Sequence, residues 1–338
     1  MDKKQIFAIP VIVGGCILSS CTKDDKELEK DNFTEGTPYI TKVLDYRPAP
    51  GQFVNVMPEY EDGDTQESMN KKVLEAIGNN NRGLITLGGY GGYVIVGFDH
   101  TIENKPDVCD FRVLGNAFVA NTPSSRGSDG SCEAGIIMVA YDKNKNGIPD
   151  ADEWFEIAGS AHSQIEKWYE EAKNAGNDVN IYNDYEMTYC RPELDPEKFT
   201  ETIEDYIRWE ANQGVVKEGY KAKNIYHKQS YYPKWIKDDK LTFSGTCLPQ
   251  NGINKGNNDS DYFVLHQFSF GYADNATNDN DGSKIDIDWA VDKSGNTVRL
   301  PGIDFIKIYT GINQENGWIG ECSTEVMGIE DLHIIKKQ

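Results

Sequence analysis

The sequence predicts a mainly β protein, an antiparallel β-sandwich of the jelly-roll type that carries a helical insertion. Short apolar runs rich in β-branched and aromatic residues, such as those at 93–98 and 135–141, are typical of buried strands. Other segments alternate apolar with polar residues, as 285–289 does, which indicates a strand with one buried face. Turns rich in Gly, Asn and Asp separate these segments, and many short strands between such turns favour an antiparallel sandwich or jelly roll.

The remaining strands and the first helix follow the same kind of reasoning. We expect a helix at 67–77, where Met69, Val73, Leu74 and Ile77 recur at helical spacing. Further strands are expected at 111–114, 117–119, 240–247, 262–272, 285–291 and 303–309.

Two later helices are expected in the middle of the chain. Residues 163–175 and 196–210 have helical patterns, and the second has Asp195 in position to cap it and Pro196 in its first turn. Both lie in a polar stretch at about 160–226, which we interpret as an insertion into one sandwich.

The N-terminus predicts a lipoprotein signal peptide at 1–20. Lys3 and Lys4 precede an apolar stretch at 6–17, which is too short to span a bilayer of about 30 Å. Leu18-Ser19-Ser20-Cys21 then reads as a lipobox, because small residues precede the cleavage point and Cys21 supplies the thiol that takes the lipid. Acyl chains such as palmitate contribute about 0.8 kcal/mol per buried CH2, so several chains would anchor the protein durably. An ordinary secretory signal with an incidental cysteine is the alternative.

Residues 21–38 form an acidic tether ahead of a single domain at 39–338. The tether is charged and nearly free of large apolar residues, so it cannot build a core. A lysine and acidic residues just after Cys21 also resemble the surface-export signal of Bacteroidota lipoproteins. That resemblance implies a lipid-anchored protein of the outer membrane that faces the outside of the cell, whereas an ordinary solvated linker is the alternative.

The charge balance excludes one class of partner. The chain holds 34 Lys and Arg against 55 Asp and Glu, a formal net charge of −21. Such a charge repels phosphate backbones, so we expect no nucleic-acid binding, and it favours sites for cations. The 18 Tyr, 13 Phe and 6 Trp supply enough aromatic surface for a folded core.

Cysteine spacing argues against a zinc site. Five cysteines lie beyond Cys21, with no C-x-x-C pair among them. One or two disulfides are compatible with an extracytoplasmic location, and at least one thiol should stay free. The five are Cys109, Cys132, Cys190, Cys247 and Cys322, of which the first two are closest in sequence.

One segment matches the D-x-N-x-N-G-x5-E pattern of calcium-binding loops across 142–153. Ca2+ takes six to eight oxygen ligands at roughly 2.3–2.6 Å, and the glycine in sixth place, Gly147, permits the sharp turn. Strand-like segments flank the loop, so we expect a structural calcium site in a β-protein and no EF-hand. The expected ligands are Asp142, Asn144, Asn146, the carbonyl of Ile148, Asp150 and Glu153, with Asp152 as a substitute for Glu153.

Two alternatives remain open for the acidic segments. The loop at 142–153 also reads as a hairpin turn rich in Asp and Asn that needs no metal. A second acidic stretch at 274–282 lacks ordered spacing and a terminal Glu, so a polar loop is favoured there over a cation site.

Catalytic motifs are missing from the sequence. The glycines at 88–92 precede a strand and no helix, so they predict a tight turn instead of a phosphate loop. No motif places a nucleophile beside Asp99 and His100, and a structural role at a strand end is the favoured interpretation of His100. We therefore expect no catalytic residue and no enzyme.

The most aromatic segment, 226–235, is the candidate ligand site. Tyr231, Tyr232 and Trp235 would give flat platforms for sugars or large planar ligands if they lie on a surface loop. If they are buried, they are only part of the core, and periodicity does not decide between the two.

Several phrases resemble a family of Bacteroidota cell-surface lipoproteins, which includes proteins described as PKD-domain-containing. The resemblance spans about 40–333, although this chain appends no PKD modules. The phrases are 47–55, 87–100, 115–118, the calcium-type loop with Trp154, 271–275 and 302–307.

The resemblance implies an accessory surface component encoded near TonB-dependent transporters, including cobamide-uptake loci. On that basis we expect capture of an extracellular nutrient, a cobamide or another small molecule, or a glycan, for a partner outer-membrane transporter. A calcium-stabilised adhesion or scaffold protein without a small-molecule site is the alternative, and a secreted hydrolase ranks behind both.

Overall fold

The computed structural model describes residues 36–120, 129–256 and 261–335, and it confirms the predicted fold class. Strands hold 35% of the residues and helices 10%, several antiparallel sheets are present, and the described part of the chain contains no barrel. Residues 33–338 form one compact unit. The predicted signal peptide, the predicted lipobox and residues 21–35 of the predicted tether lie outside the described residues. No helix in the described ranges is long and apolar enough to cross a membrane.

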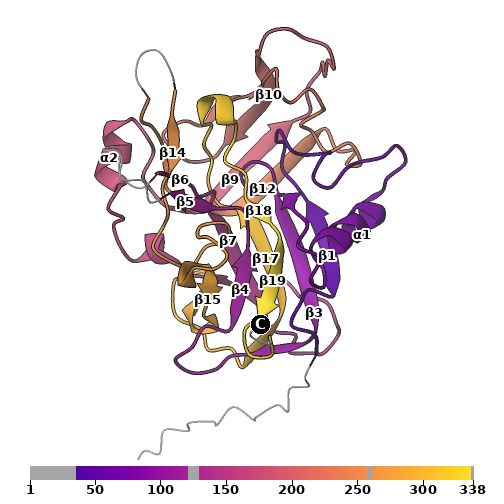
Figure 1. The fold of residues 1–338 in the computed structure, drawn as a ribbon, viewed down its shortest axis with the longest axis vertical. Coiled ribbons are helices and arrows are strands. Elements are labelled where there is room, and N and C mark those ends of the chain that lie inside the picture. Colours follow the sequence, from indigo (N-terminus) through magenta and orange to yellow (C-terminus); the bar gives the residue numbers. More distant parts are fainter. Residues whose placement is uncertain (1–35, 121–128, 257–260, 336–338) are drawn as a thin grey trace, which may run out of the picture. The chain divides into compact units, whose positions relative to one another are not determined.

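A six-stranded antiparallel sheet forms the centre of this unit (Figure 1). β17 pairs with β3 on one side and with β7 on the other, and most of its side chains are buried. The predicted strands around 93–98, 135–141 and 303–309 are therefore confirmed as its central members. In spatial order the strands are β1 (Lys42–Arg47), β3 (Tyr93–Glu103), β17 (Gly302–Thr310), β7 (Gly135–Ala140), β8 (Trp154–Ile157) and β16 (Ala290–Val291).

A second, four-stranded antiparallel sheet comes from the middle of the chain. Its strands alternate buried and exposed residues, as the side chains of Tyr185, Met187 and Tyr189 show by lying inside. One face of this sheet is therefore buried and the other faces solvent. The order is β11 (Glu218–Lys223), β10 (Ile203–Ala211), β9 (Tyr182–Cys190) and β12 (Lys240–Cys247).

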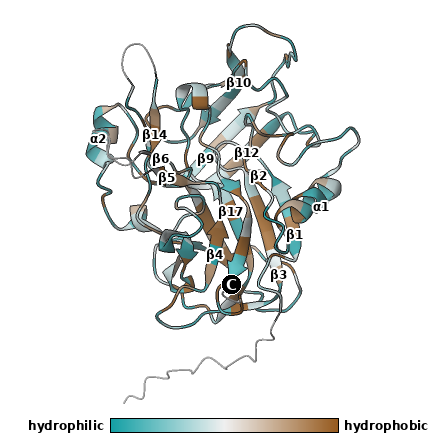
Figure 2. Ribbon diagram, in the orientation of Figure 1, coloured by the Kyte–Doolittle hydropathy of each residue, from teal (hydrophilic) through white to brown (hydrophobic). Residues whose placement is uncertain are grey.

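Aromatic rings join the two sheets into a sandwich. The rings of Tyr90 and Tyr185 meet edge to face with centroids 4.9 Å apart, and those of Tyr93 and Phe243 do so at 6.3 Å. Such contacts add to the area buried between the layers. Figure 2 shows hydrophobic colour gathered on the central strands and hydrophilic colour on α2 (Tyr169–Asn174) at the periphery.

Four shorter β elements complete the unit and carry much of the site described below. The three-stranded sheet is β15 (Lys284–Ile285), β4 (Phe111–Leu114) and β19 (Gly328–Asp331), and the pairs are β13 (Gly252–Asn254) with β14 (Phe263–Leu265), β18 (Glu325–Val326) with β2 (Ile85–Thr86), and β5 (Phe118–Ala120) with β6 (Asp129–Ser131).

The first predicted helix is confirmed as α1 (Gln66–Ile77), which packs beside β1. Thr65 caps its N-terminus, because its hydroxyl accepts the Ser68 N–H while the Ser68 hydroxyl accepts the Thr65 N–H. Met69, Val73 and Ile77 are buried, as their spacing predicts.

The helical insertion is much smaller than predicted. Of 163–175, only α2 is helical, and 196–210 forms no helix: its second half is strand β10. Ile203, Tyr206 and Ile207 fit helical spacing, but this segment pairs with β9 and β11, and those tertiary contacts decide its conformation. Asp195 caps no helix and instead accepts hydrogen bonds from Lys223 and Tyr206.

Two further segments correct the expected strand pattern, and one predicted turn is confirmed. The alternating segment at 285–291 is broken by a 3-10 helix, η3 (Ile287–Trp289), between β15 and β16, and only β14 within 262–272 is strand. The glycines at 88–92 form the predicted tight turn, with positive φ at Gly88 and Gly91.

Candidate functional site

A pocket of about 650 Å3 opens among loops and short strands drawn from the whole length of the chain. Cavities of this size are typical of small-molecule sites. Its walls come from the loop after β1, from β5 and β6, the loop after β11, the start of β14, the 3-10 helix η4 (Gly317–Ile319) and β18. We name it the aromatic–acidic pocket, after the side chains that line it: Gln52, Phe53, Phe118, Gly130, Ser131, Glu133, Tyr226, His227, Tyr262, Phe263, Trp318, Ile319, Glu321, Ser323 and Glu325.

Exposed aromatic rings stand around this pocket. Trp318 is 60% exposed, Phe118 54% and Tyr226 73%, although rings of this size are usually covered in a folded protein. Phe53 is held in place by an edge-to-face contact with His227, with ring centroids 4.8 Å apart. Large apolar rings that remain exposed around a cavity are typical of a binding surface.

Carboxyl groups lie together at the inner end of the pocket. One carboxylate oxygen from each of Glu133, Asp274 and Glu325 lies within 4.8 Å of the other two. Glu133 lies two residues before β7 and Glu325 begins β18, and both line the pocket, whereas Asp274 does not line it. We call these three residues the acidic triad.

The backbone holds Asp274 rigidly. Its Oδ1 accepts the N–H groups of Asn116 and Ala117, both at 2.8 Å, and its Oδ2 accepts the N–H of Glu325 at 3.0 Å. Asp274 itself has a positive φ of 49°, a conformation that asparagine and aspartate tolerate best after glycine. Most of the hydrogen-bonding capacity of Asp274 is therefore spent on tying the 115–117 loop to β18.

Glu133 and Glu325 are less fully engaged. Glu133 Oε1 accepts the N–H of Ser323 at 3.0 Å, and Glu325 Oε1 accepts the hydroxyl of Ser323 at 2.9 Å. Thr86 places its hydroxyl 3.2 Å from the same Glu325 oxygen. The two glutamates thus present carboxyl groups toward the cavity from a rigid frame.

Burial raises the pKa of every carboxyl group in the triad, and repulsion by neighbouring carboxylates adds to this effect for Glu133 and Glu325. Desolvation, followed by the charge of Asp274, raises the pKa of Glu133 to about 8. Desolvation raises the pKa of Asp274 to about 7, and desolvation with the charges of Glu133 and Asp274 raises that of Glu325 well above its ordinary value. The triad therefore favours protons or a cation close to it near neutral pH.

A fourth carboxylate, Glu321, also lines the pocket. Its Oε1 accepts the N–H of Gln52 at 2.6 Å, and desolvation raises its pKa to about 7 against the opposing effect of Lys221. Lys221 is buried and binds Glu315 at 2.7 Å. Its positive charge is thus already matched by Glu315.

This arrangement permits two kinds of binding chemistry. The rings offer stacking surfaces to a planar or apolar ligand, and the carboxyl groups offer hydrogen bonds or charge to a polar one. The triad is also one group of side chains that could hold a metal ion, although Asp274 retains few free lone pairs for it.

The predicted aromatic platform is buried and needs correction. Tyr231 and Tyr232 are each 1% exposed and Trp235 is 6% exposed. Trp235 stacks on Tyr46 with centroids 5.8 Å apart, and the hydroxyl of Tyr232 donates to the Asp238 carbonyl. These three rings belong to the core and offer no face to a ligand, whereas Tyr226 of the same segment does line the pocket.

The residues of the predicted calcium loop converge as expected in the connection between β7 and β8. Asp142 accepts the N–H groups of Asn146 and Gly147 at 3.0 and 2.7 Å, and the side-chain amides of Asn144 and Asn146 both reach Asp150 Oδ2. Gly147 has a φ of 80°, so the glycine in sixth place makes the turn.

Glu153 ties the two ends of this loop together. It is 3% exposed, and its two oxygens accept the N–H groups of Lys143 and Asp150 at 2.9 and 3.0 Å. Ile148 is exposed at the loop tip, and Asp152 is exposed beside Glu153. The donor set therefore fits a hard cation, and calcium binding by it stays a prediction.

Sequence reasoning missed a further carboxylate beside this loop. Asp304 of β17 accepts the N–H of Asp142 at 2.8 Å. Desolvation raises its pKa, with added contributions from the charges of Asp142 and Glu153. A cation bound in the loop would relieve this concentration of negative charge.

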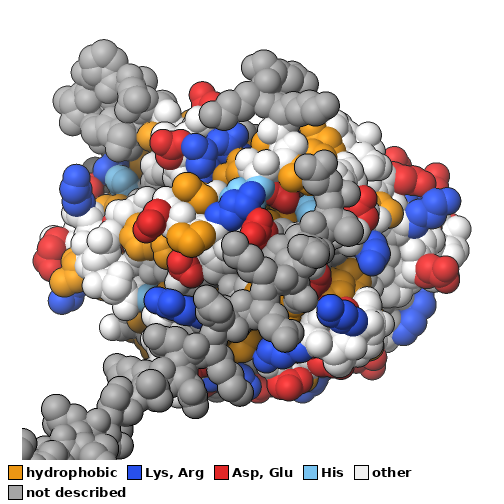
Figure 3. Space-filling view, turned by 90° about the horizontal axis from the view of Figure 1, so that it is seen from below, with side chains coloured by type: hydrophobic (Ala, Val, Ile, Leu, Met, Phe, Trp, Pro, Cys, Tyr) orange, Lys and Arg blue, Asp and Glu red, His pale blue; other side chains and the backbone are white. Residues whose placement is uncertain are grey.

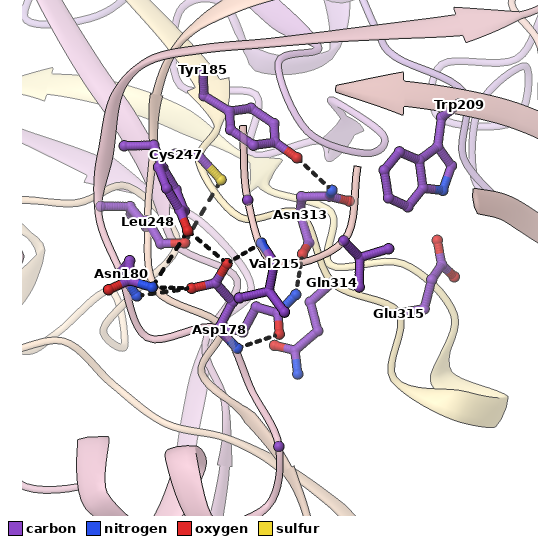
Figure 4. A pocket seen from close by; sticks show the side chains of 15 residues that line it. Asp178, Asn180, Tyr185, Trp209, Val215, Cys247, Leu248, Asn313, Gln314 and Glu315 are labelled. Atoms are coloured by element: carbon purple, nitrogen blue, oxygen red, sulfur yellow. Dashed lines mark hydrogen bonds between the residues drawn. The ribbon is translucent and has the colours of Figure 1, made fainter. Parts of the chain in front are cut away.

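A smaller pocket of about 210 Å3 is lined in part by Asn313, Gln314 and Glu315 (Figure 4). Its polar groups largely satisfy one another. Asp178 accepts hydrogen bonds from Val215, Asn180 and Tyr182, and Asn313 donates to the Tyr185 hydroxyl at 3.0 Å. With its principal groups engaged, this pocket is the weaker candidate for a ligand.

The five predicted extracytoplasmic cysteines are all described, and all are free thiols. Burial raises the pKa of Cys132 and Cys247, so these thiols are unreactive at neutral pH. His100, predicted to be structural, is buried between two carboxylates, with Nδ1 2.9 Å from Asp99 and Nε2 2.8 Å from Asp331.

The expectation that no nucleic acid binds stays a prediction based on the net charge. On the face shown in Figure 3, Lys and Arg side chains are scattered among acidic and hydrophobic ones and do not gather into one patch. A nucleic-acid surface needs such a patch.

No family model matches the chain, and no curated protein is significantly similar to it. The family resemblance based on short phrases therefore stays a prediction. Two of those phrases lie at the site, because 115–118 and 271–275 contain the backbone donors to Asp274 and Asp274 itself.

Proposed function

We propose that this protein is a surface-exposed lipoprotein that captures an extracellular nutrient in the aromatic–acidic pocket and passes it to a partner outer-membrane transporter. The observation that carries the proposal is the combination of a 650 Å3 cavity, exposed rings and carboxyl groups held by backbone hydrogen bonds. Trp318, Phe118 and Tyr226 are exposed around one cavity, and large apolar side chains gathered in this way mark interaction sites.

The pocket suits the two candidate ligand classes in different ways. Sugar rings stack on flat aromatic side chains such as Trp318, while their hydroxyls pair with carboxyl groups such as Glu133. A cobamide is too large for a cavity of this volume to enclose. It would lie across the mouth of the pocket and insert only one of its parts.

A panel of ligands tests this function. Purified protein is titrated with cyanocobalamin and with a set of oligosaccharides, and binding is followed by calorimetry and by thermal stabilisation. Trp318→Ala should weaken any binding by about tenfold or more, because an exposed ring at a ligand contact contributes more than one kcal/mol. Tyr220→Ala removes an exposed ring outside the pocket and should leave binding unchanged.

The outcomes separate the candidate functions. Binding that is insensitive to Trp318→Ala would move the site away from this pocket. Absence of binding across the panel would favour the adhesion or scaffold alternative, in which the calcium-type loop stiffens a surface module without a small-molecule site.

The location of the protein rests on the lipobox. Replacing Cys21 with Ser should abolish incorporation of labelled palmitate and release the protein from the membrane fraction. If the Cys21→Ser variant still carries label and still sediments with outer membranes, the anchor is not at Cys21.

Calcium at the 142–153 loop is the remaining part of the proposal. Asp142, Asn144, Asn146, Ile148, Asp150 and Glu153 would supply the oxygens, and the ion would stiffen the connection between β7 and β8. Its role would be structural, because the loop and the aromatic–acidic pocket share no lining residue.

A further inference from the structure

The charges on the pocket wall all have one sign. Three carboxyl groups, those of Glu133, Glu321 and Glu325, line the cavity. Among the described residues that line it there is no Lys or Arg. Lys221, the cation that affects Glu321, is 96% buried at its side chain and bound to Glu315, so it does not balance the wall.

The rest of the wall is aromatic. Trp318, Phe118, Tyr226, Tyr262 and Phe263 line the same cavity as the three glutamates. The faces of such rings carry partial negative charge, and they attract ammonium or guanidinium groups most strongly where water is excluded. The carboxylates and the ring faces therefore both attract a positively charged ligand.

Anionic ligands are excluded by the same residues. A phosphate or carboxylate placed in the cavity would meet Glu133, Glu321 and Glu325 with no cation to pair with, and burying an unpaired charge is costly. Neutral ligands can stack on the rings, but only a cation gains the attraction of the negative charge that the glutamates carry once they lose their protons.

We propose that the aromatic–acidic pocket recognises an organic cation, with an ammonium group on the Glu133 and Glu325 carboxylates and an apolar or planar body against the Trp318, Phe118 and Phe263 rings. This inference rests on the proposed nutrient capture and names the chemical class of the ligand. Amine-bearing sugars, polyamines and aromatic amines belong to that class.

The frame of the site supports this choice over a bare metal ion. Asp274 accepts three backbone N–H groups, so it acts as a fixed support behind the glutamates and has little capacity left for coordination. Trp318 and Tyr226 line the same cavity as Glu133 and Glu325. A single ion bound at the triad would leave the part of the cavity beside these rings empty.

Three matched probes test the inference on the purified full-length protein. Phenethylamine, 2-phenylethanol and phenylacetate each carry a two-carbon group on a phenyl ring. At neutral pH their net charges are positive, zero and negative, respectively. We expect phenethylamine to bind at least about tenfold more tightly than 2-phenylethanol, because one charge-assisted hydrogen bond contributes about that factor in affinity. Phenylacetate should bind most weakly of the three. Trp318 fluorescence and calorimetry report the affinities.

Two variants assign the preference to the glutamates. Glu133→Gln and Glu325→Gln should each reduce the preference for the amine to about threefold or less, while binding of 2-phenylethanol persists. Neither change threatens folding, because each removes one of several carboxyl groups that repel one another. Asp152→Asn, on an exposed loop, is the matched control and should keep the full preference.

The possible results all decide the inference. Equal binding of amine and alcohol, or no binding of any of the three up to about 10 mM, overturns it, since even fragments show measurable occupancy at that level. Stabilisation by CaCl2 alone that is lost in Glu133→Gln would make the triad a metal site and also overturn it. In each case a positive result with cyanocobalamin or oligosaccharides would leave the proposed function standing.

Discussion

The ring of His100 donates a buried hydrogen bond of 2.8 Å to the carboxylate of Asp331, which joins β3 to the final strand β19 across the core. Hydrogen bonding to Asp331 raises the pKa of His100 despite its burial. The histidine therefore stabilises the fold fully below its unfolded pKa, and this contribution is lost as pH rises through the raised folded pKa.

Removing the buried partner of His100 should destabilise the protein. We expect Asp331→Asn to lower the free energy of unfolding at pH 6 by about 2–3 kcal/mol, since it removes a buried charge-assisted bond. Asp99→Asn is the matched control, because Asp99 bonds the other ring nitrogen from a half-exposed position and should cost less than about 1 kcal/mol. Urea unfolding of both variants measures this, and equal losses would contradict it.

The acidic triad should make stability depend on pH in the opposite direction from ordinary surface carboxylates. Glu133 has a pKa raised to about 8 by burial and by Asp274, and it faces Glu321 and Glu325 as well. Its contribution is present below the unfolded pKa and falls as pH rises through about 8, so stability should decline from pH 5 to pH 8.

Glu133→Gln should flatten that decline and raise the melting temperature at pH 8. The amide keeps the shape of the side chain and cannot ionise. Melting curves at half-unit intervals of pH provide the measurement, with Glu218→Gln on the exposed edge of β11 as the control. A variant whose pH profile matches that of the original protein would show that Glu133 does not titrate in this range.

Chelation should test the calcium loop. We expect EDTA to lower the melting temperature and added CaCl2 to restore it, because the ion would neutralise carboxylates that crowd Asp304. Asp142→Ala should melt lower than the original protein and lose the response to EDTA. Asp62→Ala, which removes an exposed carboxylate outside the loop, should keep the response. An unchanged melt of the original protein in EDTA would refute the site.

Two tryptophans should separate binding from folding. Trp235→Ala removes a buried ring stacked on Tyr46 and should cost about 3–5 kcal/mol of stability. Trp318→Ala removes an exposed ring and should change stability by less than about 1 kcal/mol while it weakens ligand binding. Thermal melts with ligand titrations distinguish them, and a loss of stability in Trp318→Ala equal to that in Trp235→Ala would argue against a binding role.

Local patterns were sufficient for much of the fold. The strands at 93–98 and 303–309 and the capped helix α1 depend on burial patterns of period two or 3.6, which are visible without tertiary contacts. The segment 203–211 satisfies both periods, since Ile203, Tyr206 and Ile207 also fit a helix. Its pairing with β9 and β11 decides between them, and no local pattern contains that information.

The site was less accessible to sequence reasoning. The calcium-type loop is continuous in sequence, so its ligands were found together, but Asp304 reaches it from a distant strand. Glu133, Asp274 and Glu325 come from three separate segments, and an acidic chain offers too many glutamates to single these out. Two signals pointed toward the triad: the family phrases that contain Asn116, Ala117 and Asp274, and the acidic stretch at 274–282, which begins with Asp274.

β18 pairs with β2, and Glu325 lies opposite Thr86, so a late segment of the chain is joined to an early one. The pocket is therefore completed late in synthesis. Synthesis proceeds from the N-terminus, and early segments can begin to fold before the chain is complete. Trp318, Glu321 and Glu325 are nevertheless synthesised near the end of the chain. Most of the protein can therefore fold while these three residues are still missing from the pocket. Under the proposed function, a chain truncated before Trp318 would lack these pocket residues and would not bind the ligand.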